Sequence, residues 1–302
     1  MIFKYFIIIF LTLLNFEETN EINKNERTKD NSEIINKKCY TSFKNKNTRI
    51  IHLILTRFLI GFNNNTQEFD KLLNTDYYLL NGIRVMKKFL IPSLEHQSCK
   101  NFTWVLLLGN QINITKIITK LNIKLSFNID IIHKNEIKNY IGNKTKGFDV
   151  LITTRIDYDD IIYFDATNDV RKLINMNKPM ILHGYNRGVY YFEPERKFFE
   201  YYSNNKNGCL AIFLSLIIVL KKVTGIYTIF DIGPHPEIRT YLINKRNSFG
   251  IKKFNYEPAI FDNESPKFVY VRQKYSHNYN LHKSLKFKKE IKFNINKLYN
   301  IN

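Results

Sequence analysis

Several short motifs that identify common protein classes are missing from this 302-residue chain. It contains neither Gly-x-Gly-x-x-Gly nor Gly-x-x-x-x-Gly-Lys, so a dinucleotide-binding or phosphate-loop protein loses support. Its cysteines are Cys39, Cys99 and Cys209, and because none are closely spaced, no zinc site or disulfide framework is indicated. We expect unpaired thiols, or a single Cys39–Cys99 bridge if the chain is secreted.

The chain also lacks an apolar run long enough to span a bilayer comfortably. Residues 1–16 have one early lysine and then nearly uninterrupted apolar residues, which falls short of the ~20 residues of a membrane-spanning helix. We expect either a cleaved signal peptide or a short membrane anchor, and therefore the secretory pathway or a membrane-associated location. Residues 17–48 are polar and charged, which predicts a flexible tether.

Negative charge is scarce, since 46 Lys and Arg oppose 27 Asp and Glu and leave a net charge of +19. Such a balance is typical of partners of nucleic acids, anionic membranes or anionic substrates. The lysines are spread among asparagines and isoleucines along the whole chain, so we attribute the charge mainly to compositional bias and expect no nucleic-acid partner. The length and the apolar content of 44% predict a globular protein with a sizeable core.

From Arg49 onward, strand-like and helix-like apolar patterns alternate. This alternation predicts βαβ units, and hence an α/β fold with a mainly parallel central sheet flanked by helices. We expect Pro92 to kink or restart the first helix. The expected strands are 50–60, 102–108, 127–132 and 150–156, and the expected helices are 76–97, 114–121, 135–141 and 167–176.

Three further expectations concern the second half of the chain. Residues 180–183 and 188–192 predict a strand pair around a turn. Residues 209–220 form a strongly apolar run that is too short to span a membrane and predicts a core helix. The tail 281–302 is basic and loses core character, so the folded domain is expected at 49–280.

Three carboxylates, Asp157, Asp159 and Asp160, directly follow the fourth strand. Open α/β sheets bind ligands beyond the carboxyl ends of their strands. Clustered carboxylates repel one another unless a cation neutralises them, and hard divalent cations take oxygen ligands. The sequence therefore predicts a Mn²⁺ or Mg²⁺ site at Asp157 and Asp159. Asp160 is expected to be a further ligand, an acceptor outside the ligand shell or the cap of the next helix. A solvated turn with capping acids is the structural alternative.

Five segments occur in the order Thr56-Arg57-Phe58, Pro92-Ser93-Leu94-Glu95-His96-Gln97, Phe102-Thr103-Trp104, Thr153-Thr154-Arg155-Ile156-Asp157-Tyr158-Asp159-Asp160 and Phe268-Val269-Tyr270-Val271-Arg272. Their order resembles the rhamnosyltransferase family of glycosyltransferases over residues 50–273. The resemblance implies a glycosyltransferase-A-like fold, a nucleotide-sugar donor and a divalent metal. Arg57, at the end of the first strand, lies where such folds contact the nucleotide, and Thr56 and Arg155 are further candidates for donor binding. For Arg155 the favoured role is pairing with a neighbouring carboxylate.

A transferase that inverts the configuration at the anomeric carbon of the sugar needs a base to take the proton of the attacking hydroxyl. The candidates for that base lie in a proline- and glycine-containing segment after the acid motif, and they are Asp231, His235 and Glu237. The same segment could instead supply a third metal ligand. Glu193 and Glu195 are rival candidates. The expected acceptor is a glycan, a lipid or a protein.

Two other functions stay open from the residues alone. A non-catalytic basic protein that binds polyanions or glycans would show salt-sensitive affinity that does not need the acids. A metal-dependent phosphoryl hydrolase would usually bring further carboxylates or histidines around two metals.

Overall fold

The computed structural model describes residues 39, 47–60, 75–202, 213–232, 238–252, 255, 259–262, 266–272 and 289–296. All helices and strands that it describes belong to the unit 40–302. Residues 1–16 and most of the expected tether lie outside the described residues. Among the helices that are described, none has both the length and the apolar character to cross a membrane.

The strands are β1 (Ile50–Phe58), β2 (Thr103–Leu108), β3 (Asn128–His133), β4 (Val150–Arg155), β5 (Ile161–Ile162), β6 (Met180–Tyr185), β7 (Arg187–Phe192), β8 (Lys197–Tyr202), β9 (Leu214–Val219), β10 (Ala259–Asp262), β11 (Phe268–Arg272) and β12 (Glu290–Ile291). The α-helices are α4 (Asp76–Lys88), α5 (Leu90–Glu95), α6 (Ile114–Leu121), α7 (Ile137–Lys144), α8 (Ala166–Lys172) and α9 (Ile238–Lys245). The 3-10 turns are η1 (Lys134–Glu136), η2 (Leu220–Lys222), η3 (Ile229–Ile232) and η5 (Arg246–Phe249).

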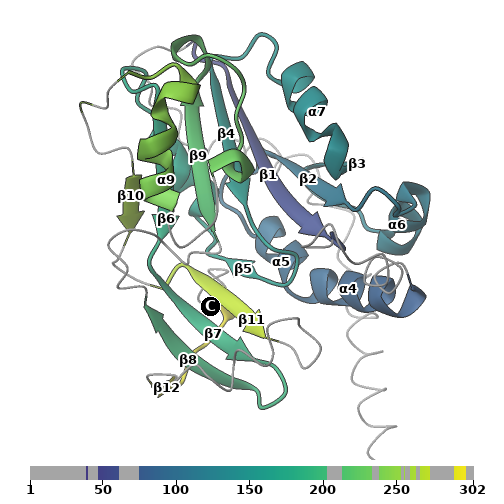
Figure 1. Cartoon of the computed structure of the whole chain (residues 1–302). Coiled ribbons are helices and arrows are strands. Elements are labelled where there is room, and N and C mark those ends of the chain that lie inside the picture. Colours follow the sequence, from purple (N-terminus) through teal and green to yellow (C-terminus); the bar gives the residue numbers. More distant parts are fainter. Residues whose placement is uncertain are drawn as a thin grey trace, which may run out of the picture. The chain divides into compact units, whose positions relative to one another are not determined.

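Within the described residues, a seven-stranded sheet has the order β10-β6-β9-β4-β1-β2-β3 (Figure 1). The strands β4, β1, β2 and β3 run parallel, as do β6 and β10, whereas β9 runs antiparallel to both β4 and β6. Because β6, β9 and β10 are the fifth, sixth and seventh strands of this sheet along the chain, the order reads 3-2-1-4-6-5-7. The predicted α/β class with a mainly parallel central sheet is confirmed.

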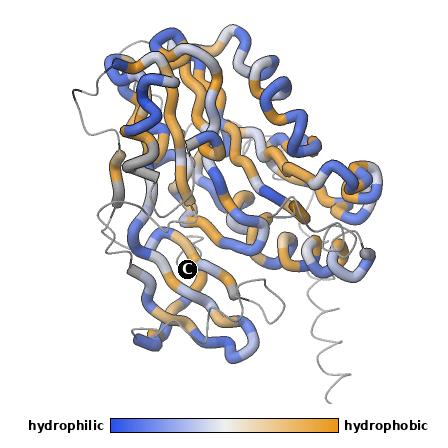
Figure 2. The backbone as a smooth tube through the Cα atoms, viewed as in Figure 1, coloured by the Kyte–Doolittle hydropathy of each residue, from blue (hydrophilic) through white to orange (hydrophobic). Residues whose placement is uncertain are grey.

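Helices cover both faces of this sheet, so its strands are apolar on both sides, as the orange strands of Figure 2 show. Successive residues of a strand point to opposite faces. Ile54 and Trp104 accordingly belong to the cluster that packs on α4, α5, α6 and α8. Leu55 and Val105 belong to the cluster that packs on α7, α9 and η3. We call these the α4 face and the α7 face.

A second sheet has the order β12-β8-β7-β11-β5, counted over the described residues. Its strand β5 begins directly after the acid motif, so this sheet is joined to the end of β4 by the acidic turn. The strand β12 lies in the tail that was expected to lack core character, and it pairs with β8. Ile291 and Phe293 pack on the third apolar cluster, so the folded structure extends beyond the expected end at residue 280.

Two expectations for the second half were wrong. The apolar run at 209–220 forms the strand β9 over its described part, because a strand buried on both faces reads as a continuous apolar run that periodicity cannot distinguish from a core helix. The segments 180–183 and 188–192 are strands, but β6 pairs with β9 and β10 whereas β7 pairs with β8 and β11. They therefore belong to different sheets.

The first helix breaks near Pro92, as expected. The helix α4 ends at Lys88 and α5 begins at Leu90. A proline ring clashes with the carbonyl four residues earlier, which is that of Lys88, and this accounts for the position of the break. Cys39 and Cys99 are both disulfide-bonded, so the expectation of unpaired thiols was wrong for these two, and Cys209 lies outside the described residues.

Candidate functional site

The site lies where the chain reverses its direction of progress through the large sheet. From β1 the chain adds β2 and β3 on one side and then returns to place β4 on the other side of β1. Open α/β sheets bind ligands at such a switch point, beyond the carboxyl ends of the strands. In this protein that position is the end of β1 at Phe58 and the end of β4 at Arg155.

The alternation of side chains along the two strands decides which residues reach this position. Arg57 and Arg155 lie two residues beyond Leu55 and Thr153, so both point to the α7 face. The two strands are adjacent, with Leu55 opposite Arg155. The two guanidinium groups therefore emerge side by side from the central strands.

Thr56 points to the opposite face and is fully buried. Its hydroxyl accepts a hydrogen bond of 3.0 Å from the indole Nε1 of Trp104 on β2. Its hydroxyl is therefore engaged in the core, on the face opposite to Arg57.

Asp157 lies between the two arginines. Its Oδ1 is 3.6 Å from Nη2 of Arg57, and its Oδ2 is 3.3 Å from Nη2 of Arg155. The three side chains are partly buried, with exposed fractions of 24% for Arg57, 13% for Arg155 and 30% for Asp157. Burial and then the charge of Arg155 lower the pKa of Arg57, while Asp157 opposes that shift. Asp157 thus partly neutralises a crowded pair of cations.

Phe230 contacts both arginines from η3. Its ring centroid is 5.4 Å from the Cζ atom of Arg57 and 5.8 Å from that of Arg155, which are cation–π distances. The turn is fixed to the sheet because the backbone N–H of Ile229 donates a 2.9 Å hydrogen bond to the hydroxyl of Thr153 in β4. The aromatic ring is therefore held in place by the strand that carries Arg155.

Asp231, a candidate base, stabilises the same turn. Its Oδ2 accepts hydrogen bonds of 2.8 Å from the backbone N–H and 2.9 Å from the hydroxyl of Thr228. The side chain is exposed, but this oxygen is committed to holding η3. His235 and Glu237 lie outside the described residues.

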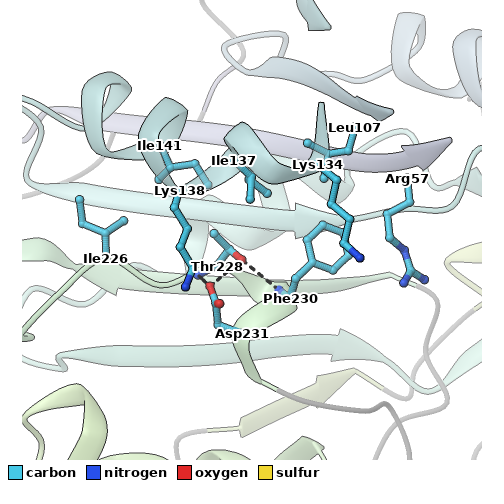
Figure 3. Close-up of a pocket in the computed structure, with 10 residues that line it drawn as sticks. All are labelled: Arg57, Leu107, Lys134, Ile137, Lys138, Ile141, Ile226, Thr228, Phe230 and Asp231. Atoms are coloured by element: carbon cyan, nitrogen blue, oxygen red, sulfur yellow. Dashed lines mark hydrogen bonds between the residues drawn. The ribbon is translucent and has the colours of Figure 1, made fainter. Parts of the chain in front are cut away.

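A pocket of about 350 Å³ opens beside Arg57 on the α7 face. It combines an apolar wall, an aromatic ring and several charges, and Figure 3 shows the ends of Arg57 and Lys134 near Phe230, with Lys138 toward Asp231. The lining residues are Arg57, Leu107, Lys134, Ile137, Lys138, Ile141, Ile226, Thr228, Phe230 and Asp231.

The three acids of the motif do not act alike. Asp160 is buried, and its Oδ1 accepts a 3.3 Å hydrogen bond from the backbone N–H of Val271 in β11. Through this oxygen it ties the acidic turn to the second sheet. Asp157 and Asp159 are half-buried. Burial and then the charges of Asp159, Asp157 and Asp160 raise the pKa of Tyr158, which keeps its phenol neutral.

In the described part of the chain, no group of three or more His, Cys, Asp or Glu side chains could by itself hold a metal ion. The rival bases are engaged elsewhere, since Glu193 pairs with Lys88 at 2.5 Å and Glu195 with Lys197 at 3.6 Å. Both glutamates lie between β7 and β8 of the second sheet.

Four residues of the site were missed in the sequence: Thr153, Phe230, Lys134 and Lys138. Thr153 belongs to the acid motif, but nothing in its neighbours predicts a bond to Ile229. Phe230 directly precedes Asp231, so the segment was noticed while its aromatic residue was not. Lys134 follows the third strand, and its place at the carboxyl end of β3 is the one signal that could have identified it.

The strand order gives an open α/β sheet with the candidate site at its switch point. No family model and no curated protein matches the chain.

Several solved structures are similar in part. A glucose-1-phosphate thymidylyltransferase from Bacillus anthracis in complex with a sucrose has 13% identity and a TM-score of 0.39, over 80% of this chain and 98% of that chain. The inositol-1-phosphate CTP transferase from T. maritima has 9% identity and a TM-score of 0.35, over 78% of this chain and 94% of that chain. A nucleotide-diphospho-sugar transferase from Desulfovibrio desulfuricans has 10% identity and a TM-score of 0.34, over 78% of this chain and 95% of that chain. At these scores the likeness carries no argument about the activity of this chain.

Proposed function

We propose that this protein is a metal-dependent glycosyltransferase that moves a sugar from a nucleotide-diphosphate donor to a hydroxyl of a glycan, lipid or protein. The observation that carries this proposal is the position of Asp157 between Arg57 and Arg155, at the switch point and beside a pocket. The motif resemblance makes rhamnose one candidate for the sugar without fixing it. We further propose that residues 1–16 direct the enzyme to the secretory pathway or to a membrane.

The pocket supports a nucleotide as the ligand. Ile137, Ile141 and the ring of Phe230 offer apolar surface to a nucleoside, while Arg57 and Lys134 offer charge to its phosphates. Arginine is suited to phosphate because its planar fork of donors matches two phosphate oxygens at once. In our proposal the nucleoside occupies the pocket and the diphosphate extends from it toward Asp157.

The acidic turn fits a divalent ion of the Mg²⁺ type in its donor chemistry. Such an ion is usually held by one or two carboxylates together with substrate phosphates and water, and it does not need a cage made entirely of protein. Asp157 and Asp159 would supply the carboxylates, while Oδ1 of Asp160 accepts a hydrogen bond from Val271. When bound, the ion would stabilise the negative charge that develops on the leaving diphosphate.

The acceptor hydroxyl must lose a proton as it attacks the sugar. Asp231 is the weakest of the three candidates for that step because its Oδ2 holds η3 through Thr228. We therefore assign the base to His235 or Glu237 and treat Asp231 as a positioning residue.

The test is thermal stabilisation of the full chain by UDP-, GDP- and dTDP-sugars, each with Mn²⁺ and with EDTA. A donor that binds the folded state raises the melting temperature through mass action. We expect one class of donor to stabilise the protein, and to do so more strongly with Mn²⁺. The same donor should then label an acceptor from a panel of glycans.

Two outcomes would contradict the proposal. Stabilisation by none of the donors would remove the nucleotide-sugar assignment. Release of free sugar with no glycosylated acceptor would indicate a hydrolase.

A further inference from the structure

Asp157 holds its two arginines loosely. Its contacts with Arg57 and Arg155 are 3.3 to 3.6 Å long. Strong charge-assisted hydrogen bonds between a cationic nitrogen and an anionic oxygen are about 2.7–2.9 Å long. The carboxylate is therefore close enough to attract both cations and too far away to make a tight bidentate bond to either.

Phe230 supports the same two arginines independently of Asp157. Both guanidinium groups contact its ring, and the turn that carries the ring is bonded to Thr153. The strands β1 and β4 place the two Cα atoms next to each other through their register. The arginines thus keep their places if Asp157 turns away.

The two guanidinium groups outnumber the one carboxylate that contacts them both. Arg57 and Arg155 bring two positive charges, and Asp157 supplies one negative charge between them. Arg57 also lines the pocket together with Lys134, so the excess of positive charge continues into the pocket. A diphosphate carries more negative charge than one carboxylate and offers several oxygens to the two forks.

We propose that Arg57 and Arg155 form a preorganised site for the diphosphate of the donor, and that Asp157 occupies this site when no donor is bound. The inference rests on the proposed function, because it takes the ligand to be a nucleoside diphosphate. Asp157 is then an internal competitor of the donor. When the diphosphate takes over the arginines, the carboxylate of Asp157 is released and becomes available to a cation.

The test measures the affinity of the full chain for UDP, GDP and dTDP by calorimetry in EDTA, so that no metal contributes. In Asp157→Asn the internal competitor loses its charge, and we expect the affinity for the preferred nucleotide to rise about tenfold, within the usual range of coupling between sites. The matched control is Asp159→Asn, which removes the same charge from the same turn. Because the ion pairs to the arginines are those of Asp157, the control should give a clearly smaller gain.

A second background separates competition from general electrostatics. If Asp157 acts by occupying the arginines, Asp157→Asn should give no gain when Arg57→Gln and Arg155→Gln are already present. A gain that persists in that background, or equal gains from both Asn variants, would overturn the inference. Circular dichroism and melting temperature establish that each variant is folded. The Mn²⁺ dependence of nucleotide binding in the unmodified chain tests the proposed function separately from the competition by Asp157.

The two proposals fail in different ways. If the unmodified chain binds a nucleoside diphosphate with Mn²⁺ but Asp157→Asn does not bind it more tightly in EDTA, the inference is wrong and the proposed function stands. If no nucleotide binds to any variant under either condition, both are wrong.

Discussion

The hydroxyl of Thr153 accepts a 2.9 Å hydrogen bond from the backbone N–H of Ile229, a residue 76 positions further along the chain. This single bond joins the central strand β4 to the turn that carries Phe230. Thr153 points to the α7 face together with Arg155, while its neighbour Thr154 points to the α4 face. The two adjacent threonines therefore serve different parts of the molecule.

Thr153→Val should weaken nucleotide binding. The substitution keeps the shape but leaves the N–H of Ile229 without its acceptor, which costs about 1 kcal/mol or more. If the loss of this bond displaces Phe230 and the arginines, binding loses about that free energy and the affinity for the nucleotide falls about fivefold. Calorimetry with the preferred nucleoside diphosphate measures it.

The control for this prediction is Thr154→Val. The hydroxyl of Thr154 is bonded to His52 and to Ser215 on the other face, so its loss should lower the free energy of unfolding without changing nucleotide affinity. Equal losses of affinity in both variants would show that η3 is not held specifically by Thr153.

Thr56→Val should lower stability and leave nucleotide affinity unchanged. Both Thr56 and Trp104 are fully buried, and the substitution leaves the indole N–H without an acceptor. A buried donor without a partner costs about 1–3 kcal/mol. Urea unfolding measures the stability, and Arg57→Gln is the comparison, because that variant should lose affinity while keeping most of its stability. A loss of affinity in Thr56→Val would restore its place in the donor site.

The three acids of the motif should give two distinct phenotypes. Asp157→Ala and Asp159→Ala should each abolish sugar transfer while the fold stays intact, because both side chains are half-buried at the site. Asp160→Ala should instead lower the free energy of unfolding, because the backbone N–H of Val271 loses its buried acceptor. Transfer assays and urea unfolding on the three variants test this division, and undiminished turnover in Asp157→Ala or Asp159→Ala would refute the metal assignment.

Stability should fall in mild acid because of His52. Burial and then the charge of Arg171 hold the pKa of His52 well below its ordinary value of 6.5. Below pH 6.5 the unfolded chain takes up a proton that the folded His52 does not, so the contribution is complete above that pH and is lost as the pH falls toward the lowered pKa. One such group changes the free energy of unfolding by up to about 1.4 kcal/mol per pH unit.

Urea unfolding at pH 7.5 and pH 5.5 measures this slope. Many groups titrate over that range, so the informative comparison is with His52→Gln, whose slope should be shallower. Identical slopes in the two proteins would show that His52 does not contribute to the pH dependence.

Local pattern was enough to predict much of the first half. The periodicity of 114–121 gave the bounds of α6, and the apolar runs at 50–60 and 150–156 located β1 and β4 to within two residues. The carboxylates that follow β4 could be placed at the ligand-binding edge because parallel strands share that edge. These predictions succeed because they depend on neighbouring residues and on the βαβ rhythm.

Pairing partners and facing directions needed the folded chain. The apolar run that ends at Leu220 became a strand that pairs with β4 and β6, and because both faces of the sheet are covered, it has no polar alternation to reveal it. Thr56 and Arg57 are adjacent in one motif, yet one fills the core and the other reaches the pocket, since successive strand residues point to opposite faces. The linear order of residues thus located the strand ends and their acids, while Phe230 came to contact both arginines only because a distant turn is bonded back onto β4.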